Sequence, residues 1–117
     1  MSKLKQGLTA ALAALAVTAG PVLAQAYPVK PVRIIVPFGA GGGTDIQGRL
    51  LGQKFQQSMG QNFLVENRSG ASGLIGAEFV ARSPADGYNI LFTTASLAVN
   101  VQLYAKRLKF DPINDLE

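Results

Sequence analysis

The chain contains neither cysteine nor histidine. Without cysteine it cannot form a disulfide, present a thiol nucleophile or carry a lipid-modified cysteine anchor. Without histidine it lacks the commonest general base and the commonest metal ligand. These two absences exclude most hydrolase and zinc-enzyme sites. We therefore expect a protein that is not an enzyme and that holds no metal ion.

Charged residues are also scarce, at 15% of the 117 residues, whereas hydrophobic residues make up 48%. This balance is typical of one globular domain with a buried core. The formal net charge is +4, but the basic residues are scattered apart from one cluster at Lys106, Arg107 and Lys109. A nucleic-acid interface needs a larger basic patch. We therefore expect no nucleic-acid partner.

The beginning of the chain carries a hydrophobic run that is too short to span a membrane. The Leu/Ala/Val-rich run covers residues 8–19, whereas a membrane-spanning helix needs roughly 20 apolar residues. Lysines precede the run, and small residues follow it at Ala24 and Ala26. This pattern is typical of a secretory signal peptide. We expect residues 1–26 to be a signal peptide that is cleaved after Ala26, a periplasmic location, and no stable membrane anchor.

Short apolar segments alternate with amphipathic ones after residue 26. We predict strands at residues 32–37, 63–66 and 88–93, and helices at residues 44–59 and 73–82. This βαβαβ order predicts the α/β fold class, with a parallel-sheet lobe whose crossovers are right-handed. The last stretch, from residue 99 onward, is expected to form a short helical turn and then an extended segment without a closing cap.

The first predicted helix has recognisable start and end signals. Thr44 and Gln47 have the spacing of an N-terminal capping box, and Gly60 stands where a glycine favours the end of a helix. Gly48 and Gly52 lie inside the helix, where each glycine costs about 1 kcal/mol relative to alanine. Their presence indicates either that the helix packs closely against the sheet or that it is somewhat loose.

Loops that follow parallel strands lie at one edge of the sheet, where ligands bind in α/β folds. The first loop, residues 38–45, carries four glycines before a helix start. Its backbone can approach an anion closely, and the helix N-terminus adds about half a positive charge. The second loop, residues 67–73, repeats this arrangement, and the third, residues 94–96, offers two hydroxyl groups. The three loops together predict a carboxylate site.

Each of these features also has a purely structural explanation. The glycines of the first loop could serve only a tight corner, and Arg68 could pair with Glu66. Asp45 in the first helical turn is explained by the helix dipole alone, since a carboxylate beside a bound anion would repel it. Thr94 could simply end a strand.

A dinucleotide site is the main alternative in another functional class. Gly39, Gly41 and Thr44 nearly match G-x-G-x-x-G, and Glu66 ends the second strand where a ribose-binding acid would lie. The third glycine is missing, however, and free nicotinamide cofactor is not expected outside the cytoplasm. No lysine follows the glycines, which excludes a P-loop.

Several segments resemble the extracytoplasmic receptors of the tripartite tricarboxylate transporter system, the Bug family. They are YPVKPVRIIVPF at residues 27–38, GGGTD at 41–45, VENR at 65–68, GAE at 76–78 and DGY at 86–88. The resemblance implies a type II periplasmic-binding, or Venus-flytrap, fold. Residues 27–117 would then form part of its first lobe, with the second lobe absent from this chain.

The resemblance also implies a function and a site. It implies a receptor that binds a small organic acid without a cofactor and passes it to membrane transporter subunits; an exported sensor module that reuses the lobe is a further alternative. Ala40, Ser69 and Ser72 depart from the common family pattern and bear on loop shape. The ligand-binding residues carried over from the family, together with Thr94 from the third loop, are Gly41, Gly42, Gly43, Thr44, Asp45, Ala71, Ser72, Gly73 and Thr94.

Overall fold

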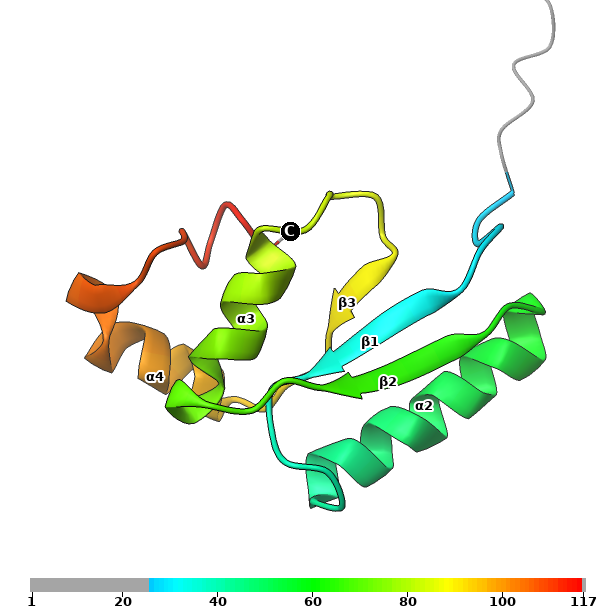
Figure 1. Cartoon of the computed structure of the whole chain (residues 1–117), viewed down its shortest axis with the longest axis horizontal. Coiled ribbons are helices and arrows are strands. Elements are labelled where there is room, and N and C mark those ends of the chain that lie inside the picture. The colour runs from blue at the N-terminus through cyan, green and yellow to red at the C-terminus, as the bar shows by residue number, and fades with distance from the viewer. Residues whose placement is uncertain (1–25, 117) are drawn as a thin grey trace, which may run out of the picture.

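A three-stranded parallel sheet separates helix α2 from helices α3 and α4 (Figure 1). The computed structural model describes residues 26–116. In chain order its elements are β1 (Val32–Val36), α2 (Gly43–Met59), β2 (Phe63–Asn67), the 3₁₀ helix η2 (Ala71–Gly73), α3 (Leu74–Ala81), β3 (Asn89–Leu91), α4 (Ser96–Leu103) and the 3₁₀ helix η3 (Ala105–Arg107). The predicted α/β class and the βαβαβ order are confirmed.

Strand β1 lies in the middle of the sheet, which has the order β2-β1-β3. It pairs in parallel with β2, from Val32 opposite Phe63 to Val36 opposite Asn67, and in parallel with β3, where Arg33 lies opposite Asn89. Its four aliphatic side chains are at most 1% exposed. Such burial on both faces is expected for a β-branched strand in a parallel sheet, and it confirms the prediction for this segment.

Helix α2 approaches the sheet through its two internal glycines. A Cβ atom on Gly48 would lie 3.1 Å from a methyl group of Val36, and one on Gly52 would lie 3.1 Å from the carbonyl oxygen of Phe63. A side chain at either position would push the helix away from the sheet. The predicted close packing is therefore confirmed, and it explains why α2 keeps two residues that weaken an isolated helix.

The two ends of α2 differ in how well they were predicted. Gly60 ends the helix in the left-handed conformation with a φ of 71°, as expected, and its N–H donates to the carbonyl oxygen of Gln56. The predicted capping box of Thr44 and Gln47 is wrong. Gly42 is the N-cap residue and no side chain caps it, because the helix starts earlier than predicted and Thr44 lies inside the first turn.

The last part of the chain is more ordered than predicted. Strand β3 covers only Asn89–Leu91 of the predicted residues 88–93. Helix α4 begins soon afterwards, at Ser96, and the N–H of Leu97 donates to the carbonyl oxygen of Thr94. The expectation of an uncapped extended ending is also wrong. The carboxylate of Asp111 accepts the N–H groups of Ile113 and Asn114, which closes a turn.

The predicted signal peptide falls almost entirely outside the described residues 26–116, so its cleavage and the predicted domain boundary stay predictions. Within the described range, every helix falls short of the length and apolar character that a membrane crossing requires.

Candidate functional site

All three strand-to-helix loops lie at one edge of the sheet. The strands are parallel and end in register, since Val36 at the end of β1 lies opposite Asn67 at the end of β2. Figure 1 shows the loops after β1, β2 and β3 leaving the sheet at the same edge, the one from which α2 and α3 begin. The sequence-based prediction that these loops share an edge is confirmed.

The glycine loop, residues 37–42, presents an open backbone. Gly41 has a φ of +82°, which glycine adopts without strain. Built Cβ atoms on Gly39, Gly41 and Gly43 would meet nothing within 4 Å, so this side of the loop is open space. No side chain caps α2, and the N–H groups of a first helical turn have no partner inside the helix. The N–H groups of Gly43 and Thr44 are therefore available to an anion.

Asp45 holds the glycine loop instead of facing that open space. Its side chain is almost fully buried, and one carboxylate oxygen accepts the N–H of Gly41 at 2.8 Å. Arg49 donates to the same carboxylate at 3.1 Å, and the Asn67 amide donates to it at 3.0 Å. Three hydrogen bonds to the carboxylate lower the pKa of Asp45 to about 2; the bond from Arg49 has the largest effect, followed by those from Gly41 and Asn67. The helix dipole alone is thus not the explanation of this residue.

Asn67 joins the end of β2 to the glycine loop. Its side-chain nitrogen donates to the carbonyl oxygen of Phe38 at 3.1 Å as well as to Asp45, and its oxygen accepts from Arg49 at 3.2 Å. The candidate list from the sequence omits both Asn67 and Arg49. Two signals could have found them: Arg49 follows Asp45 at the i,i+4 spacing, and Asn67 ends a strand that neighbours β1.

The second loop contains a turn of four consecutive residues with positive φ, residues 70–73, here called the positive-φ turn. Ala71 and Ser72 have φ values of 45° and 56°, a conformation that costs a non-glycine residue roughly 1–2 kcal/mol. Strain of this kind is concentrated at functional sites. Ala71 and Ser72 are exposed, and the carbonyl oxygen of Ser72 accepts a hydrogen bond from Asn100 at 2.8 Å.

Gly73 connects the two loops from the inside. It is buried, and a Cβ atom built on it would lie 3.6 Å from Pro37 and 3.7 Å from the Phe38 ring. Its N–H donates to the carbonyl oxygen of Gly70. The N–H groups of Gly41 and Gly73 are thus used within the chain. Among the predicted site residues, the open backbone positions are Gly42, Gly43, Thr44, Ala71 and Ser72.

The third loop brings hydroxyl groups to the same edge. The hydroxyl oxygens of Thr94 and Ser96 lie 2.6 Å apart and both residues are exposed. Thr93, which precedes Thr94, was not predicted as a site residue. Its hydroxyl oxygen is nevertheless buried and has no hydrogen-bond partner among residues 26–116.

The other charged groups near the edge are engaged with one another. Arg68 donates to Glu66 at 2.7 Å and lies 3.5 Å from the centre of the Phe79 ring, so the predicted pairing with Glu66 is confirmed. Arg33 also contacts the Glu66 carboxylate, at 3.4 Å. A carboxylate held by two arginines does not fit the ribose-binding acid of the dinucleotide alternative. Across residues 26–116, no three acidic side chains come together in a way that could hold a metal ion.

Comparison with known proteins gives a consistent result. Residues 48–117 match the family described as the tripartite tricarboxylate transporter family receptor. Protein BugT of Bordetella pertussis strain Tohama I is 47% identical over 87 residues, which cover 73% of this chain and 27% of BugT.

Two solved structures extend the comparison to the fold. The structure of a periplasmic transporter is similar with a TM-score of 0.70 and 48% identity, over 75% of this chain and 30% of that one. The structure of R. palustris Rpa4515 with adipate is similar with a TM-score of 0.55 and 45% identity, over 56% of this chain and 22% of that one. The chain thus spans less than a third of the length of BugT and of each of these two chains.

Proposed function

Because the chain belongs to the tripartite tricarboxylate transporter receptor family, we propose that it is part of a periplasmic receptor that captures a small organic carboxylate. The observation that carries this proposal is that two backbone segments without a side-chain cap follow strands that end at the same sheet edge. The start of α2, after β1, offers the N–H groups of Gly43 and Thr44, and the positive-φ turn, after β2, presents the exposed residues Ala71 and Ser72. Both segments suit an oxyanion.

The ligand class is a small dicarboxylate or a related acid. Rpa4515, which this chain resembles, holds adipate in its structure. A charge-assisted hydrogen bond contributes roughly 1.5–3 kcal/mol. Two or three of them from one lobe would give about 4 kcal/mol after the cost of ordering the ligand, which corresponds to a millimolar dissociation constant. Tighter binding would need a second wall of contacts, as in receptors that close around their ligand.

The site is built for binding and not for chemistry. Asp45 and Glu66 both form ion pairs with arginine side chains, so both carboxylates are already engaged within the chain. The chain offers no histidine or cysteine to take over such a role. We therefore infer that the receptor releases its ligand unchanged, to membrane subunits of a transport system, after export through the signal peptide at residues 1–26.

The proposal can be tested by NMR titration of the full chain with adipate, because this method detects millimolar binding at individual residues. We expect the amide signals of Gly42, Gly43, Thr44, Ala71 and Ser72 to move and to saturate. Val in place of Gly43 would put a side chain over the N–H groups, in a space that is open in the protein, so the fold should persist. We expect Gly43→Val to bind adipate at least about tenfold more weakly, which is about 1.4 kcal/mol.

Gly39→Val is the matched control, because a Cβ atom at Gly39 also meets nothing within 4 Å and this residue precedes the helix start. It should bind adipate as the unchanged protein does. Unchanged affinity in Gly43→Val, with an unchanged spectrum elsewhere, would mean that the glycines only turn the chain.

A further inference from the structure

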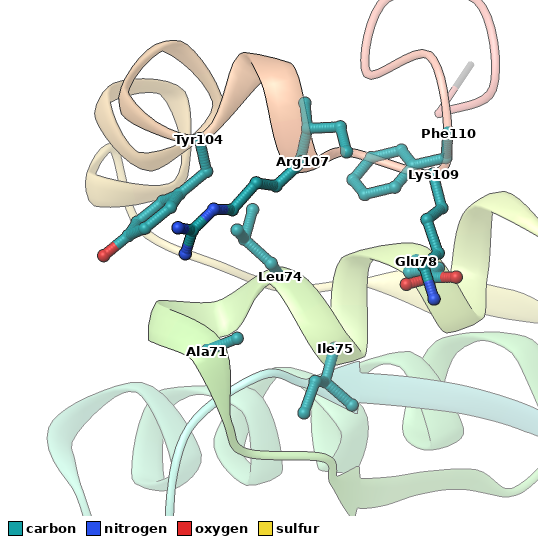
Figure 2. A pocket seen from close by; sticks show the side chains of 9 residues that line it. Ala71, Leu74, Ile75, Glu78, Tyr104, Arg107, Lys109 and Phe110 are labelled. Carbon is teal, nitrogen blue, oxygen red and sulfur yellow. The ribbon is translucent and has the colours of Figure 1, made fainter.

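A groove of about 250 Å³ lies between α3 and the segment that follows α4. Figure 2 shows Leu74 and Ile75 of α3 on one side, and Arg107, Lys109 and Phe110 on the other. This volume is just below the roughly 300–1,000 Å³ of small-molecule sites. The groove therefore has room for a ligand of about one ring.

Apolar side chains form most of the groove wall. Leu74 and Phe110 are half-buried, and Ile75 is 52% exposed. Leu108 lines the groove as well. Ile75 and Tyr104 are exposed, so water reaches the groove. An apolar body of matching size would displace that water and gain roughly 25 cal/mol for each Å² buried.

The groove also carries positive charge that the described chain leaves unneutralised. Neither Arg107 nor Lys109 forms an ion pair with any residue from 26 to 116. The acidic residue in the wall is Glu78, and its carboxylate is held by Arg82 at 2.9 Å. Figure 2 places the Lys109 side chain on the Glu78 side of the groove. Arg107 lies at the other end, where no carboxylate lines the wall.

Arg107 and Tyr104 both line the groove. In the view of Figure 2 the guanidinium group of Arg107 lies between the Tyr104 ring and the Leu74 side chain. A guanidinium group binds a carboxylate through two parallel hydrogen bonds and tolerates an aromatic neighbour. The combination of an apolar wall, an aromatic ring and an open guanidinium group matches one ligand chemistry: a flat apolar body with a single carboxylate.

We propose that this groove is a second organic-anion site, which binds an aromatic monocarboxylate with its ring between Leu74 and Phe110 and its carboxylate on Arg107. It differs from the site proposed at the sheet edge, where backbone N–H groups would bind the anion. The two sites share one neighbour. Ala71 lines the groove and also belongs to the positive-φ turn, so a ligand in the groove would contact that turn.

The test is an NMR titration of the full chain with sodium benzoate. We expect saturable shifts at the amides of Leu74, Ile75, Arg107 and Lys109. Benzamide has the same ring without the charge, and acetate has the charge without the ring. Each should bind at least about tenfold more weakly than benzoate, because each loses one of the two contributions.

Two variants separate the groove from the sheet edge. Arg107→Gln should weaken benzoate binding at least about tenfold, since it removes a charge-assisted pair, and should leave the adipate shifts in place. Lys54→Gln, which removes an exposed lysine of α2 outside the groove, should change neither. Gly43→Val should still bind benzoate, so the failure of one site is distinguishable from that of the other.

Three results would overturn the proposal. They are benzoate shifts confined to residues 41–45, equal binding of benzoate and benzamide, and no saturable shift at the groove. Binding of an acidic peptide in the absence of benzoate binding would instead make the groove a protein contact, and would equally overturn it.

Discussion

Replacement of Gly76 by alanine should separate α3 from the end of β1. A Cβ atom built on Gly76 would lie 2.7 Å from the Cβ of Pro37 and 3.0 Å from both the Pro37 Cα and the carbonyl oxygen of Arg68. Carbon atoms in contact normally lie about 3.5–4.0 Å apart. A proline ring and two backbone groups cannot rotate out of the way, so the helix itself must move by roughly 0.8 Å or more.

The size of the effect follows from two opposing contributions. Overpacking against rigid neighbours costs about 1–3 kcal/mol, and the upper part of this range applies here because two of the three contacts are with backbone atoms. Alanine is better than glycine inside a helix by about 1 kcal/mol. We therefore expect Gly76→Ala to lower the free energy of unfolding by about 2 kcal/mol, which would lower the melting temperature of a domain of this size by roughly 8–16 °C.

Urea unfolding followed by circular dichroism at 222 nm would measure the difference. Gly43→Ala is a suitable control, because Gly43 is also helical and a Cβ atom there meets nothing within 4 Å. It should be as stable as the unchanged protein or slightly more stable. If Gly76→Ala matched or exceeded the stability of the unchanged protein, the inferred close approach of α3 to Pro37 would be wrong.

Two further predictions concern acid and export. The pKa of Asp45 is lowered from 3.8 to about 2, so the stability that its carboxylate contributes is present above pH 4 and is lost as the pH falls toward 2. The urea midpoint of Asp45→Asn should therefore depend less on pH in this window than that of the unchanged protein. An equal dependence would contradict the role of Asp45 in holding the glycine loop. Mass spectrometry of periplasmic material should find a mature chain that starts at Tyr27, whereas an intact chain starting at Met1, found only in the cytoplasm, would refute the signal peptide.

The local pattern of the sequence was sufficient to predict α2, α3 and the three strands of the sheet, but not α4. The β-branched run at β1 predicts a strand buried on both faces, and the internal glycines of α2 predict its closeness to the sheet. Both features depend on the size of side chains and on their spacing along the chain, which can be read from a short stretch of sequence. The rule for right-handed crossovers placed the three strand-to-helix loops at one edge of the sheet.

Contacts between distant residues were beyond this kind of reasoning. Asn67 reaches Phe38 and Asp45 because the ends of β1 and β2 lie side by side in register, and this register is not visible in either segment alone. The capping box failed for a related reason. Thr44 has the spacing of a capping box, but the helix start is organised by Asp45, which accepts hydrogen bonds from Gly41 and Asn67.

The central position of β1 also has a consequence for how the chain folds. Val32 pairs with Phe63, and Arg33 pairs with Asn89, so neither pairing can begin as a hairpin between neighbouring segments. Sheets built only from distant parallel pairings form slowly, because a long loop must close before any contact compensates for the lost entropy. β1 is made first, and its partner strands follow only at Phe63 and Asn89. For a protein exported as we propose, this delay keeps the chain unfolded and able to pass through a membrane channel before the sheet forms.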